Sequence, residues 1–184
     1  QALLAHPDMS VDALPMLAPA ELAARAEWNA TASSYPADLC LHDLVAAQAA
    51  RTPDAVALRY GEQSLSYAAL EQRANTLAHH LRSLGVARGA LVGVYMERSL
   101  DMLVALLAVL KAGGAYVPLD PGFPASRIAM MLEDSALRLV LTQNALVDAL
   151  PSTPAQRLCI DGDWAQNAAD AHSPLPDPAQ PEDL

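Results

Sequence analysis

The sequence predicts an α/β fold with a mostly parallel sheet and flanking helices, and residues 91–121 carry the main evidence. Residues 91–95 form a short apolar run without strict alternation, which is typical of a strand buried on both faces of a parallel sheet. An almost wholly apolar stretch at 102–110 has the length of a buried helix, and residues 115–117 begin a second strand. Because parallel strands need a crossover connection, this stretch is expected to form one strand–helix–strand unit.

Single residues mark the ends of this helix and of the second strand. Ser99 is a favourable helix N-cap, and Asp101 falls in the first turn, where the helix dipole favours negative charge. Gly113 and Gly114 are expected to end the helix, because glycine readily adopts the left-handed conformation that closes a helix. Pro118 lacks a backbone donor, so it either ends the second strand or places that strand at a sheet edge.

Two helices and a hairpin are expected before this unit. Residues 41–50 show helical spacing of apolar side chains, and Pro53 ends the pattern. Residues 55–60 and 64–66 are interpreted as two short strands joined by a turn. A longer helix follows Ser66, its expected N-cap. The core face of that helix is predicted to comprise Leu70, Ala74, Leu77, Leu81 and Leu84.

Shorter elements are expected after the unit. Pro124 fits the first position of a helix whose buried face holds Ile128, Met131 and Leu132. The remaining predictions are a strand at 137–141, a short helix at 142–150 and a final strand at 157–160. From Asp161 onward the chain is rich in Pro and carries six carboxylates but no Lys or Arg, which predicts an irregular, exposed segment.

The first 38 residues are interpreted as an irregular and helical arm. Residues 1–6 have the composition of a helical piece without a cap, and residues 21–28 predict a short helix. Residues 29–38 combine Ser, Thr, Pro and Ala, which is typical of a linker. Trp28 is expected to pack against another surface, because a Trp side chain has a large apolar area to bury.

Composition and charge exclude several classes of function. Hydrophobic residues make up 53% of the 184 residues, which is enough for a sizeable core. The formal net charge is −10, so binding to nucleic acid or to an anionic membrane is not expected. Cys40 and Cys159 show no disulfide framework and no Cys/His metal spacing, and are expected to be free thiols. No secretory signal or membrane-spanning stretch is recognised, which favours a cytoplasmic location.

Two short motifs invite a ligand-binding interpretation that the residue order does not support. In a phosphate loop the glycines precede the lysine and open a helix, whereas Lys111 precedes Gly113 and Gly114, which close one. Lys111 is therefore expected to cap the C-terminus of its helix. His79 and His80 are adjacent, so their rings diverge on a helix, and they are expected to be exposed surface rather than zinc ligands.

Other polar residues near element ends are also expected to be structural. Ser99 lacks the nucleophile elbow of a catalytic serine, and Asp120 is expected to bind backbone N–H groups of its own turn. Glu133 and Asp134 are expected to be exposed or paired with Arg138. No constellation supplies a nucleophile with its base, a metal set or a phosphate loop, so no catalytic, cofactor-binding or metal-binding residue is predicted.

Two motifs carry a resemblance to a known family. Residues 110–121, LKAGGAYVPLDP, resemble the second core motif of the adenylation domains of nonribosomal peptide synthetases, and residues 65–70, LSYAAL, resemble the first. The similarity continues in order through residues 50–58, 74–86 and 131–142. The resemblance implies that residues 39–184 are a partial N-terminal subdomain of an adenylate-forming enzyme, truncated before its phosphate loop.

The N-terminal arm carries a second part of the resemblance. Residues 14–31, LPMLAPAELAARAEWNAT, resemble the segment that joins a condensation domain to an adenylation domain. The resemblance implies the tail of a condensation domain at residues 1–8 and an interdomain linker at residues 9–38. A solvated N-terminal arm is the alternative interpretation of the same residues.

The resemblance implies an activity for the parent enzyme. Such domains activate an amino acid with ATP and Mg²⁺ to an aminoacyl adenylate and load it onto the phosphopantetheine thiol of a carrier domain. The family's phosphate loop, amino-acid pocket and catalytic lysine follow later in its pattern, and residues 181–184 resemble only the approach to that loop. No site residue of the family can therefore be placed on this chain, which alone is expected to be inactive and to bind no cofactor.

The resemblance also implies partners: the rest of the adenylation domain, the condensation and carrier domains, and a small accessory protein as a further candidate. One position departs from the family pattern, because Ala69 stands where a Glu usually completes a capping box with Ser66. Two alternatives stay open from sequence, a piece of an acyl- or aryl-CoA ligase and a non-catalytic α/β interaction module.

Overall fold

The computed structural model describes residues 10, 16–162 and 179–183. The expected condensation-domain tail at residues 1–8 lies outside the described residues, as does most of the acidic segment after Asp161. The chain divides into two compact units, Gln1–Pro36 and Ala37–Leu184.

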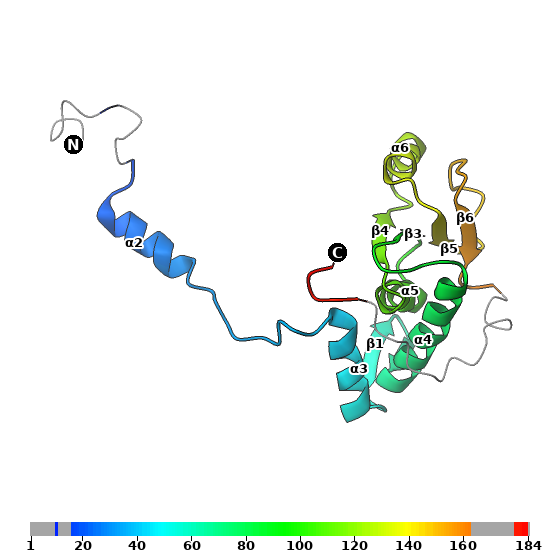
Figure 1. Ribbon diagram of the computed structural model, residues 1–184, viewed down its shortest axis with the longest axis horizontal. Helices are drawn as coiled ribbons and strands as arrows, with labels where there is room; N and C mark the ends of the chain where they lie inside the picture. Colours follow the sequence, from blue (N-terminus) through cyan, green and yellow to red (C-terminus); the bar gives the residue numbers. More distant parts are fainter. Residues whose placement is uncertain (1–9, 11–15, 163–178, 184) are drawn as a thin grey trace. The chain divides into compact units, whose positions relative to one another are not determined.

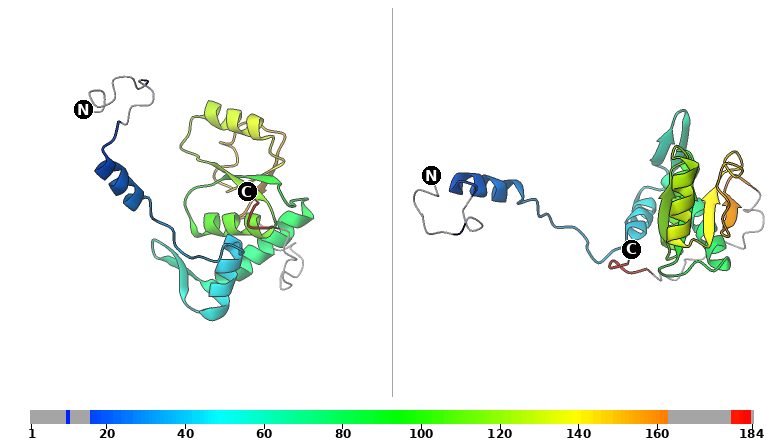
Figure 2. Two further views of the ribbon diagram at one scale, coloured as in Figure 1. Left: turned by 60° about the vertical axis from the view of Figure 1, so that its left-hand side comes forward. Right: turned by 90° about the horizontal axis from the view of Figure 1, so that it is seen from above.

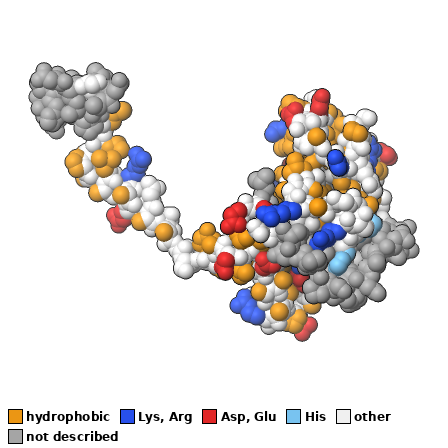
Figure 3. Space-filling view, in the orientation of Figure 1, with side chains coloured by type: hydrophobic (Ala, Val, Ile, Leu, Met, Phe, Trp, Pro, Cys, Tyr) orange, Lys and Arg blue, Asp and Glu red, His pale blue; other side chains and the backbone are white. Residues whose placement is uncertain are grey.

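In the first unit the described helix is α2, which spans Pro19–Trp28 (Figure 1). Glu21 accepts a hydrogen bond from the Ala18 backbone N–H at 2.6 Å, so the negative charge lies at the positive end of the helix. None of the residues in α2 is buried, and Trp28 is 76% exposed. The short helix was therefore predicted correctly, but the expectation that Trp28 packs on another surface is wrong for the described chain. Figure 3 shows hydrophobic side chains on the surface of this segment.

The second unit is built on a four-stranded sheet in the order β4-β3-β5-β6, with every pairing parallel. The strands are β3 (Leu91–Tyr95), β4 (Ala115–Leu119), β5 (Leu139–Thr142) and β6 (Gln156–Cys159). In the centre, Gly93 pairs with Val117 on one side and Val140 on the other. Pro118 lies in β4, which pairs only with β3 among the described strands, so the prediction of an edge strand is confirmed.

Helices cover both faces of this sheet (Figure 1). Val92 and Val94 of β3 pack in the cluster formed with α4 (Tyr67–Ser83) and α5 (Leu100–Lys111). The opposite face packs with α6 (Ala125–Ser135) through Val140, Leu119, Ile128 and Leu132. The predicted α/β class with a parallel sheet and flanking helices is thus confirmed, and the two-sided burial explains the apolar strand sequences.

The helix α5 is buried around most of its circumference, as its sequence predicted. Ser99 accepts a hydrogen bond from the Met102 backbone N–H at 3.1 Å, which confirms the N-cap. Leu103 is 39% exposed and faces outward. The position of α5 between the sheet and α4 explains the burial of the other side chains. The buried residues of α5 are Val104, Ala105, Leu107, Ala108, Val109 and Lys111.

The remaining helices of this unit follow the sequence less closely. In α4, Leu70, Ala74, Leu77 and Leu81 are buried as predicted, and Leu84 is partly buried. In α3 (Leu41–Arg51) the buried residues are instead His42 and Ala49. Leu41 is 63% exposed, so apolar spacing alone did not identify the packed face of α3.

The predicted hairpin is present as β1 (Val56–Tyr60) and β2 (Gln63–Ser66), paired antiparallel. It packs with α4 and α5, and α3 lies against α4 (Figure 2). Ser66 ends β2 and accepts a hydrogen bond from the Ala69 backbone N–H at 3.3 Å, so one residue closes the strand and begins α4.

Two predictions after β4 need correction. Residues 144–149 form turns rather than the expected short helix, with hydrogen bonds such as Leu146 N–H to the Gln143 carbonyl at 2.9 Å. These turns are enough to connect the two neighbouring strands β5 and β6, so the chain needs no regular helix there. Pro124 is the N-cap of α6 rather than its first residue, with a φ of −54° that suits either position.

Two glycines are required by close packing. A Cβ on Gly93 would lie 2.8 Å from Leu137 Cδ1 and 3.0 Å from Val140 Cγ2. A Cβ on Gly114 would lie 3.0 Å from the Ala90 carbonyl oxygen. The central strand and the end of α5 are therefore close to their neighbours at positions where any side chain would collide.

Candidate functional site

The carboxyl ends of the four parallel strands meet at one edge, where open α/β sheets place their ligands. Gln143, after β5, accepts a hydrogen bond from the Glu97 backbone N–H at 2.8 Å through Oε1. Asp161, after β6, accepts from the Asn144 backbone N–H at 2.9 Å. These side chains tie the loops after β3, β5 and β6 to one another, so the edge is organised by local contacts.

Two candidates from the sequence also bond to their own backbone. Asp120 accepts a hydrogen bond from the Gly122 N–H at 2.8 Å, which confirms its predicted role in a turn. The Ser99 hydroxyl donates to the Glu97 carbonyl at 3.3 Å and caps α5, so it is held as a cap and not presented as a nucleophile. Glu133 and Asp134 are exposed, as predicted.

Lys111 forms an interhelical ion pair instead of the predicted C-terminal cap. Its ammonium Nζ lies 2.6 Å from Glu71 Oε1 of α4, and the side chains are 8% and 22% exposed. Asn75 also donates to the same carboxylate oxygen at 3.4 Å. The cap prediction is wrong because α4 places a carboxylate within reach of the ammonium group. Gly113 and Gly114 nevertheless end α5 as predicted, and Gly113 has a φ of +88°.

The adjacent histidines are partly buried, so the expectation of a fully exposed pair is wrong. His79 and His80 lie in the second half of α4 and both take part in contacts. Neither belongs to a group of potential metal ligands among the described residues.

A different group of potential metal ligands forms at the start of α3, where sequence reasoning expected none. Cys40 Sγ, a His42 ring nitrogen and an Asp43 carboxylate oxygen all lie within 4.8 Å of one another. His42 Nε2 is 3.7 Å from Asp43 Oδ1, and Asp43 Oδ2 accepts a hydrogen bond from the Cys40 backbone N–H at 3.0 Å. The available signal was a Cys-x-His-Asp sequence at a helix N-terminus, which is a weak pattern by itself.

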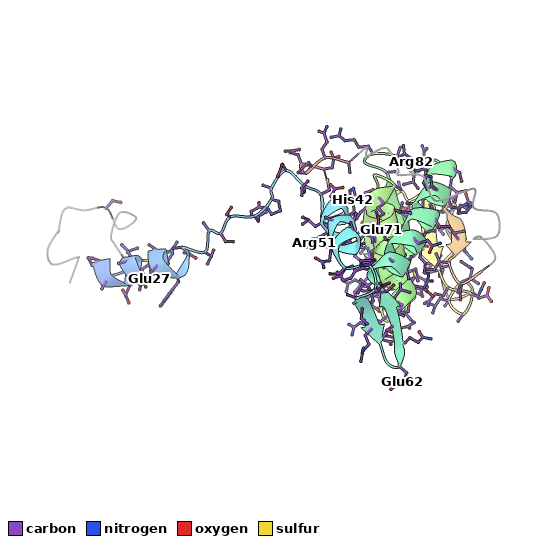
Figure 4. The ribbon with its side chains drawn as sticks, turned by 90° about the horizontal axis from the view of Figure 1, so that it is seen from below. Glu27, His42, Arg51, Glu62, Glu71 and Arg82 are labelled. Atoms are coloured by element: carbon purple, nitrogen blue, oxygen red, sulfur yellow. The ribbon has the colours of Figure 1, made fainter. Side chains whose placement is uncertain are left out.

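This group borders a pocket with a volume of about 550 Å³. Cys40 and His42 line one side of the pocket, and Tyr116, Gln180 and Asp183 line other parts. Figure 4 shows His42 on α3 within the same unit as Glu71 of α4. The pocket gives small molecules and ions access to the start of α3.

The second cysteine has a different environment. Cys159 ends β6 and is partly buried, and burial together with the nearby Asp161 carboxylate raises the pKa of its thiol. Both cysteines are free thiols, which confirms the prediction. Since the thiolate is the reactive and metal-binding form, the surroundings of Cys159 disfavour both uses.

The segment at residues 179–183 is held by an exposed ion pair. Arg88 Nη2 donates to Asp183 Oδ1 at 2.6 Å, and the Gln180 backbone N–H donates to Asp183 Oδ2 at 2.8 Å. The Arg88 hydrogen bond is the main reason that the pKa of the Asp183 carboxyl lies below its ordinary value. The described part of this segment contains a turn.

Comparison with known proteins identifies the family. The family described as AMP-binding enzyme matches residues 45–184. The chain belongs to this family. The resemblance to adenylation domains of nonribosomal peptide synthetases, and the assignment of the chain to the N-terminal part of such a domain, are confirmed. In the described residues, no helix has the length and apolar character to cross a membrane.

The relatives of this AMP-binding chain are much longer proteins. It is 49% identical over 158 residues to a subunit of linear gramicidin synthase from Brevibacillus parabrevis, covering 86% of this chain and 3% of the relative. It is 42% identical over 185 residues to tyrocidine synthase 3 of the same organism, covering the whole chain and 3% of that protein. The chain thus spans a small part of the relatives it matches.

Solved structures give the same family assignment. The AMPPNP-bound form of the nonribosomal peptide synthetase FmoA3 matches with a TM-score of 0.78 and 36% identity, covering 90% of this chain and 18% of that one. The N-terminal subdomain of Klebsiella oxytoca NpsA, in complex with 3-hydroxybenzoyl-AMSN, matches with a TM-score of 0.69 and 25% identity, covering 80% and 37%.

The described residues of this AMP-binding chain do not fit a triphosphate site. The single lysine, Lys111, is held by Glu71, and the glycines after it close a helix. At the sheet edge, Asp120 and Asp161 already accept backbone N–H groups. No nucleotide chemistry is therefore assigned to these residues.

Proposed function

We propose that this chain is the first part of an adenylation domain whose parent protein activates an amino acid with ATP and Mg²⁺ as an aminoacyl adenylate. The parent then transfers the aminoacyl group to a phosphopantetheine thiol on a carrier domain. The observation that carries the proposal is the 49% identity over 158 residues to a subunit of linear gramicidin synthase.

The role of the chain in that reaction is structural. It supplies the parallel sheet, the buried α4–α5 layer and the α6 layer of the larger subdomain. Its polar groups at the sheet edge hold loops to one another, as Gln143 does with Glu97. The groups that bind nucleotide and amino acid are expected from other segments of the parent protein.

The proposed domain organisation assigns residues 1–8 to a condensation domain, residues 9–38 to an interdomain linker and residues 39–184 to the adenylation domain. The separation of the chain into units at Pro36 and Ala37 supports a boundary near the end of that linker. The expected partners are the condensation domain, the carrier domain and the rest of the adenylation domain. A cytoplasmic location is proposed from the two free thiols.

The test is ATP–pyrophosphate exchange over the common amino acids, with the intact mass of each preparation measured alongside. Exchange with a small set of amino acids is expected from the complete parent protein, and none from the 184-residue chain alone. Exchange from a preparation that contains only this chain would overturn the structural role. No exchange from the folded parent with any amino acid would overturn amino-acid activation.

A second assay on the parent protein separates the alternatives. A piece of an acyl- or aryl-CoA ligase predicts thioester formation on free coenzyme A instead of on a carrier domain. The relatives do not favour this alternative, because they include gramicidin and tyrocidine synthases and a nonribosomal peptide synthetase of known structure. A non-catalytic interaction module predicts neither product from the parent protein.

A further inference from the structure

Three different metal-ligating side chains converge at the first turn of α3. Cys40 is the N-cap, and His42 and Asp43 follow within that turn. One ligand atom from each lies within 4.8 Å of the other two. His42 is only 8% exposed, so its ring is held among its neighbours rather than free to swing in solvent. The group combines sulfur, imidazole nitrogen and carboxylate oxygen, which is a set that Zn²⁺ accepts.

The distances suit a tetrahedral ion after a small adjustment. With bonds of about 2.0–2.3 Å, the ligand atoms of tetrahedral zinc lie roughly 3.3–3.8 Å apart. The 3.7 Å between His42 Nε2 and Asp43 Oδ1 already falls in that range. The remaining separations need to shorten by no more than about 1.5 Å, which rotation of a Cys side chain supplies.

The backbone around Asp43 leaves one carboxylate oxygen for a metal. Its Oδ2 accepts the Cys40 backbone N–H at 3.0 Å, while Oδ1 is the atom that faces the imidazole. This hydrogen bond orients the carboxylate in the way that outer contacts commonly orient metal ligands. The helix N-terminus opposes a bound cation, but it also favours the thiolate form that a metal needs.

The pocket of about 550 Å³ gives an independent reason to expect a ligand here, because Cys40 and His42 both line it. Three protein ligands and one position that is open to solvent form a common arrangement for zinc. We propose that Cys40, His42 and Asp43 bind a zinc ion, whose fourth position is open to this pocket. Such an ion is distinct from the Mg²⁺ of the proposed reaction, because a thiolate ligand selects a softer metal.

The first test is Zn²⁺ titration of the 184-residue chain, followed by absorption spectroscopy with Co²⁺ in its place. The wild type is expected to bind one Zn²⁺ per chain, and the Co²⁺ form to show a sulfur-to-metal charge-transfer band. Cys40→Ser is expected to lose the band and at least about tenfold in affinity, because even the outer contacts of a metal site typically contribute 10–100-fold. Serine is a preferred N-cap, so this variant keeps the start of α3.

Cys159→Ser is the matched control. Cys159 is the other free thiol and lies outside the ligand group, so the variant is expected to keep both the band and the affinity. His42→Gln is expected to weaken Zn²⁺ binding while the Co²⁺–sulfur band is shifted or lost. His79→Gln, a change to a histidine in α4, is expected to leave binding unchanged.

Three outcomes would overturn the proposal. One is equal affinity in the wild type and Cys40→Ser, which would assign the metal to other residues. Another is a charge-transfer band that disappears in Cys159→Ser instead. The third is absence of Zn²⁺ binding by a wild-type chain with a native-like circular dichroism spectrum.

Discussion

The helices α5 and α2 were predicted from similar local signals, yet they have opposite environments. Six of the residues of α5 are buried, whereas none of those in α2 is. Each has an acidic residue in its first turn, Asp101 in α5 and Glu21 in α2. The comparison teaches that local signals predict where a helix forms, but the surfaces around it decide how much it contributes to stability.

The interior of the second unit therefore carries the largest expected mutational effect. Replacing Lys111 by Met leaves the Glu71 carboxylate without its cation, and Glu71 Oε2 already lacks a hydrogen-bond partner among the described residues. Breaking a buried pair from one side costs about 3 kcal/mol or more, so Lys111→Met is expected to lower the free energy of unfolding by about 3 kcal/mol. Urea denaturation measures this loss.

The control is the double variant Glu71→Gln with Lys111→Met. It removes both charges, so the free energy of unfolding is expected to recover by more than half of the loss, because the remaining groups carry no uncompensated buried charge. A double variant as unstable as Lys111→Met alone would show that lost packing, and not the orphaned carboxylate, explains the effect.

The next effect concerns the centre of the sheet. Gly93→Ala places a methyl group within 2.8 Å of Leu137 Cδ1, on the face that packs with α6. Overpacking of this kind is expected to cost about 1–3 kcal/mol, measured by the same denaturation experiment. Gly61→Ala is a useful comparison, because a Cβ there meets nothing within 4 Å and any loss comes from its φ of +56° alone. No loss for Gly93→Ala would contradict the packing argument.

A smaller, stabilising effect is expected at the start of α4. Ser66 already accepts the Ala69 N–H, but the reciprocal side-chain acceptor of a capping box is absent at position 69. Ala69→Glu is expected to raise the free energy of unfolding by about 0.5–1 kcal/mol. Ala69→Gln tests whether charge is needed, since both side chains complete the box. An unchanged or lowered melting temperature for Ala69→Glu would reject the prediction.

An exposed ion pair sharpens the contrast with Lys111 and Glu71. The pKa of Asp183 is lowered in the folded chain, chiefly by the hydrogen bond from Arg88. Its contribution is therefore present above the ordinary value of 3.8 and is lost as the pH falls through the lower folded pKa. Arg88→Gln is expected to lower the melting temperature slightly at about pH 6 and not at about pH 2. A difference that persists at the lower pH would contradict this sign.

The smallest effect is expected in α2. Trp28 is 76% exposed, so Trp28→Ala is expected to change the free energy of unfolding of the 184-residue chain by less than about 0.5 kcal/mol. Tryptophan fluorescence of the wild type is expected to show a solvent-exposed contribution that this variant lacks. A loss comparable to that of Gly93→Ala would show that α2 has a packing partner in the chain.

Much of the fold could be predicted because its signals are periodic or local. The unbroken apolar run of β3, and the spacing of Leu70, Ala74 and Leu77 in α4, follow from patterns in the chain itself. The turns at 144–149 could not be separated from a helix, because the apolar residues there are too few to distinguish the two. Likewise, the packed face of α3 was missed since His42, not Leu41, faces the interior.

The candidate site was harder to predict than the fold. Asp120 and Ser99 bond to backbone within three residues, so their roles were accessible from sequence. The partner of Lys111 lies 40 positions earlier in the chain, and no local rule connects the two. The group at Cys40 depends on the side-chain directions of one helical turn, which sequence spacing does not specify.

By itself, the sequence determined the α/β class, the parallel strand–helix–strand unit and the family, because apolar periodicity, caps and the two core motifs lie in contiguous residues. Only the tertiary structure decided that Lys111 meets Glu71, that Trp28 stays exposed, and that Cys40 gathers two more ligand atoms. The physical reason is that hydrogen bonds within a helix or turn are local, whereas burial and charge pairing depend on which surfaces the fold brings into contact.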